Sequence, residues 1–246
     1  MERINKLLAR AGVASRRAAD EMIREGRVTV NGTICRELGT RINPATDAVK
    51  VDGRRIQFDT GGRLYLMLNK PGHVVTTLSD PEGRSTVADY LKSFRGHIFP
   101  VGRLDFMSEG LLLLTNDGDW AQTMMHPSSK VEKVYRVKVR GIPEAETLER
   151  LSTGFPLDGR RTAPAKYMLT RRGANYSWLE VTLTEGRKNQ IRRLLQAVGH
   201  PVSRLKRIAV GGVVLGDLPV GRVRHLTESE TALLKSRSPK GRKRRN

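Results

Sequence analysis

Asp105 lies in the part of the chain whose residue types and spacing best suit acid–base or nucleophilic chemistry. It stands in residues 101–110, directly before the apolar run 111–114, which predicts a strand buried on both faces. Gly102 and Gly110 permit unusual backbone angles on either side of the carboxylate. The residues alone fit two roles: a catalytic carboxylate in a strained loop, or a structural aspartate that holds a turn by its own hydrogen bonds.

Cations accompany this carboxylate in the sequence. Arg103 is two positions from Asp105, so in an extended segment both side chains point to one side. A second group of basic residues crowds a later stretch, in which no acidic residue lies between positions 188 and 207. Because lysine and arginine neutralise phosphates, we expect some of this group to hold a nucleic-acid backbone. The group consists of Arg187, Lys188, Arg192, Arg193, Arg204, Lys206 and Arg207.

The composition also indicates a polyanionic partner. Lysine and arginine outnumber aspartate and glutamate by 45 to 25, which gives a formal net charge of +20. Such a charge attracts nucleic acid, and an anionic membrane surface is the alternative. The sequence has no apolar run long enough to span a membrane and no signal-peptide pattern at its first residues, so we expect a cytoplasmic protein. The single cysteine, Cys35, excludes an internal disulfide.

Residues 1–58 are expected to form a small domain of two helices followed by short strands. Ser15 can cap a helix that starts with Arg16 and Arg17, where free backbone N–H groups and the helix dipole favour phosphate. Arg27 lies just beyond the end of this helix. Taken alone, these charges fit RNA binding and a solvated charged face equally well. The turn signals of this domain are Asn31-Gly32 and Asp52-Gly53.

The rest of the chain is expected to hold one larger domain. A polar break at 59–63 predicts a linker, and the second domain should span 64–234. Alternation at 131–139 predicts a strand, and the apolar spacing at 191–198 predicts a helix. Strands and helices are mixed without a regular pattern, which favours an α+β fold over a doubly wound sheet. The basic tail 235–246 should be disordered and contact phosphates.

The first domain resembles the small alpha-L RNA-binding module first seen in a small-subunit ribosomal protein. The pattern Leu-x-x-x-Gly-x-Ala-Ser-Arg-Arg, followed by residues 23–32, matches the core of that module almost throughout. The resemblance implies that Arg16, Arg17 and the turn around Arg27 face structured RNA.

Residues 102–118 resemble the signature of pseudouridine synthases of the RsuA/RluB group. The motif reads Gly-Arg-Leu-Asp, three further residues, Glu-Gly, four leucines and Thr-Asn-Asp-Gly. Ser108 departs from the group, which usually has threonine there, but it keeps the hydroxyl. The resemblance implies an alpha-L domain followed by a mixed, mainly antiparallel-sheet catalytic domain. Further segments that agree with the group, in order, are 68–72, 132–137, 185–193 and 199–207.

The resemblance also implies an activity, the conversion of uridine to pseudouridine in ribosomal RNA, with Asp105 as the carboxylate that starts the reaction. Arg192 is then the expected cation that keeps this carboxylate ionised in a dry pocket, and Arg103 is the second choice. Tyr135 is expected to stack on the target base, which must flip out of its helix to reach the site. The residues expected to line the apolar wall of the pocket are Ile191 and Leu194.

This reaction gains and loses no atom, so no cofactor and no metal are expected, and the sequence has no phosphate-binding loop or metal-ligand cluster. The expected partner is ribosomal RNA or a ribosome-assembly intermediate, bound by a monomer. Residues 193–205 resemble the large-subunit enzymes of this group more than the small-subunit ones, which implies large-subunit (23S) rather than small-subunit (16S) RNA as the substrate. Three competing functions are a non-catalytic RNA-binding assembly factor, a methyltransferase and a basic membrane-surface protein. The sequence leaves open whether the carboxylate attacks ribose, attacks the base or removes a sugar proton.

Overall fold

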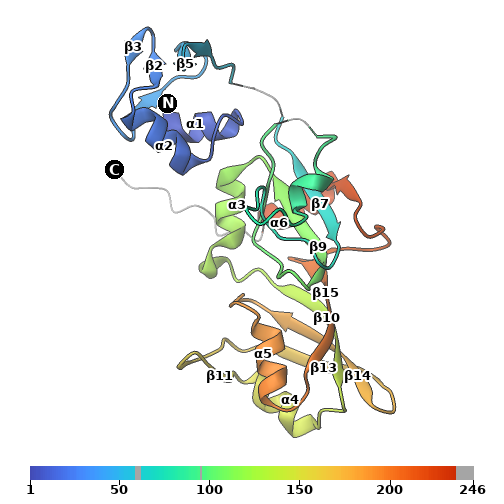
Figure 1. Ribbon diagram of the computed structural model, residues 1–246. Helices are drawn as coiled ribbons and strands as arrows, with labels where there is room; N and C mark the ends of the chain where they lie inside the picture. Colours follow the sequence, from blue (N-terminus) through green and yellow to red (C-terminus); the bar gives the residue numbers. More distant parts are fainter. Residues whose placement is uncertain (59–61, 95, 237–246) are drawn as a thin grey trace. The chain divides into compact units, whose positions relative to one another are not determined.

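The chain forms two compact units, each with its own core (Figure 1). One unit holds Met1–Arg63 together with Ser93–Ile98, and the other holds Leu64–Lys92 and the chain from Phe99 onward. The residues described by the computed structural model are 1–58, 62–94 and 96–236.

Most of the expected linker at 59–63 and most of the expected tail at 235–246 lie outside the described residues. The last helix, α6 (Glu228–Ser236), extends past the expected start of the tail. A capping box starts this helix, since the Thr227 N–H donates to the Glu230 carboxylate at 2.8 Å and the Glu230 N–H donates to Thr227 Oγ1 at 3.2 Å. No helix of the described chain has the length and apolarity needed to cross a membrane.

The first unit packs two helices, α1 (Ile4–Arg10) and α2 (Arg16–Arg24), against short strands. Leu7, Ala19 and Ile23 are at most 1% exposed, because the apolar spacing seen in the sequence places them on one face of each helix. Ser15 caps α2 as expected, since its Oγ accepts a hydrogen bond from the Ala18 N–H at 3.2 Å.

The strands of this unit form an antiparallel sheet in the order β3–β2–β5–β6, and β1 pairs with β4. Positive φ angles at Asn31 and Gly32, and again at Asp52 and Gly53, confirm the two expected tight turns. The strand bounds are β1 Glu2–Arg3, β2 Val28–Val30, β3 Thr33–Ile34, β4 Arg41–Ile42, β5 Val49–Val51 and β6 Arg54–Arg55.

A nine-stranded sheet organises the second unit, with β13–β14–β10–β15–β9–β7–β17 as its main path (Figure 1). Its neighbouring strands pair antiparallel in the described chain, except that β9 and β15 pair in parallel. This mixed, mainly antiparallel sheet with helices confirms the α+β expectation. The bounds are β7 Tyr65–Lys70, β8 Phe99–Pro100, β9 Glu109–Thr115, β10 Lys133–Arg140, β13 Lys166–Arg172, β14 Tyr176–Leu183, β15 Val202–Val210, β16 Val213–Val214 and β17 Val223–His225.

Helices cover parts of this sheet. α3 (Gly118–Met125) contributes Trp120 to a core that also contains Leu111, Leu113 and the α6 residue Leu234. Farther along the sheet, α4 packs against β13 and α5 against β15, and on that side Val137, Val139, Leu179 and Val181 are fully buried. The remaining bounds are α4 Ala145–Ser152, α5 Gln190–Ala197, η1 Val87–Tyr90, η2 Pro127–Ser129, β11 Pro156–Leu157 and β12 Arg160–Arg161.

The parallel contact between β9 and β15 depends on Gly110. Its φ is +104°, and a Cβ added there would overlap the carbonyl oxygen of Arg207 on the neighbouring strand. Arg207 is 5% exposed, and its Nε donates to the Leu111 carbonyl at 2.7 Å. The close approach of two backbones therefore requires glycine at position 110.

Lys70 ends β7 beside this contact and is fully buried. Its Nζ donates to the carbonyls of Pro71 and Val74, each at 2.7 Å. Burial lowers the pKa of Lys70 to about 8, although the carboxylates of Glu109 and Asp105 act in the opposite direction. A buried ammonium group thus lies within electrostatic reach of the loop that carries Asp105.

Replacing Gly110 with alanine should lower the free energy of unfolding by about 3 kcal/mol or more, because both the positive φ and the overlap with Arg207 oppose a side chain. Urea denaturation followed by circular dichroism measures the change. Gly186→Ala is the control, because its added Cβ would meet open space at an ordinary φ. An equal loss of unfolding free energy in the two variants would contradict the requirement for glycine at position 110.

The stability contribution of Lys70 should depend on pH. Its pKa falls from the ordinary 10.5 to about 8 on folding, so the unfolded chain binds more protons between these values and native stability rises with pH across this window. As the pH rises through this window, the unfolding free energy of the wild type should increase by up to about 3 kcal/mol relative to that of Lys70→Met. Urea titrations below, within and above the window test this. Lys92→Met, at an exposed position, should show no such trend relative to wild type.

Candidate active site

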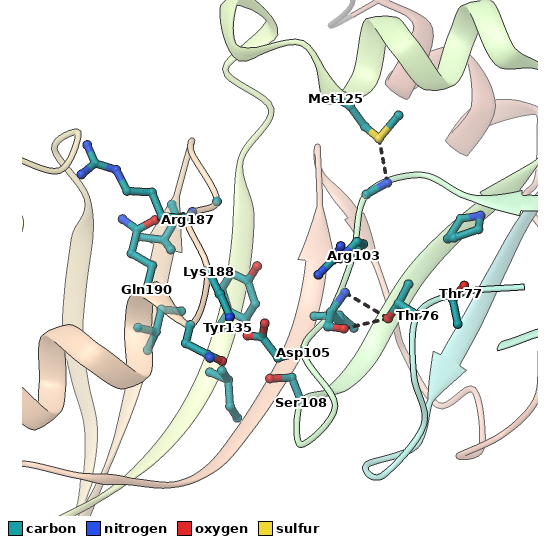
Figure 2. A pocket seen from close by; sticks show the side chains of 18 of the residues that line it. Thr76, Thr77, Arg103, Asp105, Ser108, Met125, Tyr135, Arg187, Lys188 and Gln190 are labelled. Atoms are coloured by element: carbon teal, nitrogen blue, oxygen red, sulfur yellow. Dashed lines mark hydrogen bonds between the residues drawn. The ribbon is translucent and has the colours of Figure 1, made fainter. Parts of the chain in front are cut away.

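A cavity of about 700 Å³ in the second unit brings together segments that are far apart in the sequence (Figure 2). The loop before β9 contributes Asp105 and Ser108, β10 contributes Tyr135, and β15 contributes Leu205. The segment that leads into α5 forms another part of the lining with Gly186, Arg187, Lys188, Asn189, Gln190 and Ile191.

The loop that carries Asp105 is held by backbone atoms and by one threonine hydroxyl. Thr76 Oγ1 donates to the Leu104 carbonyl at 2.7 Å and accepts from the Leu104 N–H at 3.3 Å (Figure 2). The Ser108 N–H donates to the Asp105 carbonyl at 2.9 Å and closes a turn. Among the described residues, no hydrogen bond or salt bridge involves the Asp105 carboxylate. The turn is therefore held without this carboxylate, which leaves it free for chemistry.

Arg192 lies close enough to Asp105 for the two charges to interact. Its guanidinium donates to the carbonyls of Met107 and Val202 at 3.3 and 3.4 Å, so α5 is tied to the loop that carries Asp105. Burial lowers the pKa of Arg192, and the negative charge of Asp105 opposes this effect. An arginine remains protonated at neutral pH in either case, so the carboxylate has a permanent cation nearby.

Tyr135 and Ser108 are the other groups that face the cavity beside Asp105 (Figure 2). Tyr135 is 9% exposed and lies on the face of β10 that turns toward the cavity. Ser108 is 1% exposed, and its hydroxyl has no hydrogen-bond partner in the described chain. Because a buried hydroxyl without a partner is costly, Ser108 is a ready donor or acceptor for a bound molecule.

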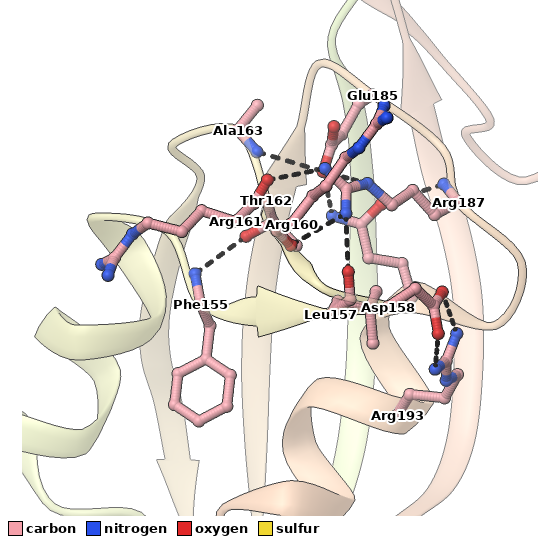
Figure 3. A network of polar contacts seen from close by, with 11 residues as sticks. Phe155, Leu157, Asp158, Arg160, Arg161, Thr162, Ala163, Glu185, Arg187 and Arg193 are labelled. Carbon is pink, nitrogen blue, oxygen red and sulfur yellow. Dashed lines mark hydrogen bonds and ion pairs between the residues drawn. The ribbon is translucent and has the colours of Figure 1, made fainter.

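Arg187 lines the cavity, but its guanidinium is bound to the chain itself (Figure 3). It donates to the carbonyls of Leu157, Arg160 and Arg161 at 3.1, 3.2 and 2.6 Å, and it lies 3.6 Å from the carboxylate of Glu185. These bonds occupy the guanidinium of Arg187, and the phosphate contact expected of this residue stays a prediction. Arg187 fixes the rim of the cavity to the hairpin formed by β11 and β12.

The remaining expected residues of this stretch divide between cavity, interior and surface. Ile191 lines the cavity as expected, and Lys188 and Arg103 line it too. Leu194 does not line it and is 1% exposed, since its position on α5 turns it into the core. Arg193 forms an ion pair with Asp158, with Nη1 at 2.8 Å from the carboxylate (Figure 3).

The strand register places Arg207 on one face of the sheet and Arg204 and Lys206 on the other. Arg207 pairs with Tyr135 across β10 and β15, so it points inward, and its bond to the Leu111 carbonyl keeps it from contacting phosphate. Arg204 and Lys206 alternate with it and therefore point to the opposite face of the sheet. They lie on the face of the sheet away from the cavity, and their contact with RNA stays a prediction.

In the first unit, Arg16 and Arg17 are exposed at the start of α2, as expected. Arg27 is already paired, since its Nη2 lies 2.7 Å from Asp52 and its Nη1 lies 3.1 Å from Glu25.

Sequence reasoning missed three residues that shape the cavity. Thr76 pins Leu104 from 28 positions away, and no local pattern marks that contact. The Gly102 N–H donates to Met125 Sδ at 3.0 Å, which ties the loop to the end of α3 (Figure 2). Gln190 accepts from the Arg187 N–H at 3.0 Å. The Gln190 in the run 185–193 could have been singled out, because that run already resembled a family motif.

Known proteins resemble this chain over both of its units. Residues 64–197 match the RNA pseudouridylate synthase family, and residues 2–47 match the S4 domain. An uncharacterized RNA pseudouridine synthase of Aquifex aeolicus is 45% identical over 94% of this chain and 93% of its own length. The ribosomal large subunit pseudouridine synthase B of Bacillus subtilis is 41% identical over 98% of both chains.

A solved structure of a pseudouridylate synthase also has the same fold. It is 30% identical in sequence, with a TM-score of 0.69 over 95% of this chain and 100% of that one. The family match covers more than half of the chain and includes the loop of Asp105, the strand of Tyr135 and the helix of Arg192. The chain therefore belongs to the RNA pseudouridylate synthase family and carries an S4 domain ahead of its synthase domain.

Proposed function

We propose that this protein isomerises specific uridines to pseudouridine in ribosomal RNA, and that large-subunit (23S) RNA is its substrate. The observation that carries the proposal is the Asp105 carboxylate, which faces a cavity beside Tyr135 and interacts with the charge of Arg192. The Bacillus subtilis relative, named for the ribosomal large subunit, supports the choice of RNA.

The chemistry assigns one task to each of these groups. The bond between ribose C1′ and uracil N1 breaks, the base turns, and C1′ joins C5. C5 then releases its proton to solvent, and N1 takes up a proton, so no atom is gained or lost. Asp105 starts this sequence, and Arg192 balances its charge. The ring of Tyr135 supports the base, and the free hydroxyl of Ser108 is available to orient it.

The two units divide the work in this proposal. Residues 1–58 bind structured RNA through Arg16 and Arg17, and residues 64–234 carry out the isomerisation. The protein acts in the cytoplasm as a monomer, because the RNA itself supplies the large interface.

Asp105→Asn should reduce turnover by about 10³-fold or more while RNA affinity stays within error, because the amide keeps the shape and loses the charge. Tritium release from C5-labelled uridine in unmodified 23S and 16S RNA measures turnover, and filter binding measures affinity. Asp217→Asn, at an exposed position, is the matched control and should behave as wild type.

The same assay tells the competing functions apart. Release from 16S RNA alone would replace the large-subunit assignment with the small-subunit one. If wild-type protein released no tritium from either RNA, free or in assembly intermediates, the protein would be a non-catalytic RNA-binding factor.

Arg16→Gln combined with Arg17→Gln should weaken binding of 23S RNA and flatten its salt dependence by about 2 in log–log slope, because two phosphate contacts are lost. Affinity measured by filter binding across a salt series tests this. The control removes two cations that are ion-paired within the same unit, Arg10→Gln with Arg24→Gln. A slope equal to that of the control pair would argue against α2 as an RNA contact.

A further inference from the structure

The face of the sheet that points away from the cavity carries a dense group of cations. In the register of β10 with β15, Lys138 pairs with Arg204 and Arg136 pairs with Lys206. In the register of β14 with its neighbours, Trp178 pairs with both Lys138 and Arg171. Residues paired across antiparallel strands share a face, so these side chains form one surface. We call it the basic sheet face: Arg136, Lys138, Arg140, Arg171, Arg204 and Lys206, with Tyr176, Trp178 and Glu180 among them.

This arrangement opposes the stability of the sheet. Like charges that stand directly opposite each other on neighbouring strands repel, and two such pairs occur side by side here, Lys138 with Arg204 and Arg136 with Lys206. No salt bridge joins the six cations of the basic sheet face to any acidic residue in the described part of the chain. By contrast, Arg27, Arg193 and Arg224 each bind a carboxylate. Glu180, opposite Arg136 on β14, offsets part of this repulsion, and an anion bound to the face would offset more of it.

Protection of the sheet edge does not account for these charges. Cations on an edge strand block unwanted strand pairing, and Arg171 on β13 is placed to do that. The four residues of the two opposed pairs, however, lie on β10 and β15, which have neighbours on both sides. Their positive charge therefore needs another explanation.

An aromatic side chain lies within this charge. A cavity of about 360 Å³ is lined by Trp178, Arg136, Arg171, Thr170 and Glu180. A bulge in β13 between Leu169 and Arg171 brings Arg171 opposite Trp178, and Thr170 Oγ1 donates to the Trp178 carbonyl at 3.1 Å. Beside it, the Lys138 ammonium lies 4.0 Å from the centre of the Tyr176 ring. An indole flanked by guanidinium groups can stack a base and hold its phosphate at the same time.

We propose that the basic sheet face binds a single-stranded segment of RNA, with one base against Trp178 and phosphates on Arg136 and Arg171. The proposal rests on the proposed function, because that segment belongs to the same RNA whose uridine enters the catalytic cavity. Tyr135 and the basic sheet face lie on opposite faces of β10, so the two sites bind different parts of the RNA. The second contact adds affinity and selectivity for a large RNA without touching the reacting nucleotide.

The composition of the surface favours RNA over the other occupants of a sheet face. A second copy of this chain, with its charge of +20, would bring like charge to like charge. A membrane surface would require bulky apolar side chains that project outward, but both aromatic residues are half-buried here. Met168 is the one strongly exposed large apolar residue among the described residues of β10, β13, β14 and β15.

The test uses a fluorescein-labelled oligocytidylate of about 12 nucleotides, a length typical of single-strand binding surfaces. It has no uridine and so cannot serve as a substrate in the catalytic cavity. Arg136→Gln with Arg171→Gln should weaken its binding about tenfold and flatten the salt dependence by about 1.4 in log–log slope, for two phosphate contacts. The control, Lys92→Gln with Arg150→Gln, removes the same charge from exposed positions elsewhere. It should change neither the affinity for the oligocytidylate nor the salt dependence of binding.

Intrinsic fluorescence identifies the contact residue. The chain has two tryptophans, and Trp120 is 6% exposed in the core, so quenching by oligocytidylate should come from Trp178 and disappear in Trp178→Phe. On 23S RNA, the Arg136→Gln/Arg171→Gln protein should show a raised KM and an unchanged kcat for tritium release. Wild-type tritium release reports the proposed function separately, so the failure of one proposal can be told from the failure of the other.

Two results would overturn the inference. One is equal affinity and equal salt dependence for the Arg136→Gln/Arg171→Gln pair and its control pair. The other is quenching of Trp178 by phosphatidylserine vesicles but not by oligocytidylate, which would assign the face to a membrane surface.

Discussion

The contact between Gly110 on β9 and Arg207 on β15 holds the second unit together as one sheet. It is the parallel junction between an antiparallel group of strands, β13, β14, β10 and β15, and another group, β9, β7 and β17. The loop that carries Asp105 ends at this junction, and Tyr135 is the cross-strand partner of Arg207. A shift of β15 against β9 would therefore move the carboxylate relative to the aromatic ring.

The same junction concentrates buried charge. Lys70 and Arg207 lie in the interior near Glu109 and Asp105, and Arg192 approaches Asp105 from α5. Burying a cation is costly unless other groups compensate, and here backbone carbonyls accept hydrogen bonds from all three. The cations are thus fixed before any substrate arrives. A developing negative charge in the cavity would meet a field that needs little reorganisation.

The sequence predicted the α+β class and the positions of Asp105, Tyr135 and Ile191 at the cavity, because a long motif and strand alternation mark them. It could not identify the partner of a side chain where that partner lies far away in the chain. Arg187 was taken for a phosphate ligand, but the carbonyls that hold it belong to the hairpin at Leu157–Arg161. The sequence alone presents Arg204, Lys206 and Arg207 as one group. In the strand β15, Arg207 points to one face of the sheet, and Arg204 and Lys206 point to the other.

The alternation of side chains along β10 and β15 lets these two strands serve two purposes. Their inward residues, Tyr135 and Arg207 among them, build the catalytic cavity and its support. Their outward residues carry cations that form no salt bridge within the described part of the chain. Successive side chains of a strand point to opposite faces, so the two surfaces share a backbone but no side chains. The outward face can therefore change its charge and its RNA preference while the geometry around Asp105 is preserved. An enzyme built this way can alter which RNA it holds without altering the reaction it performs.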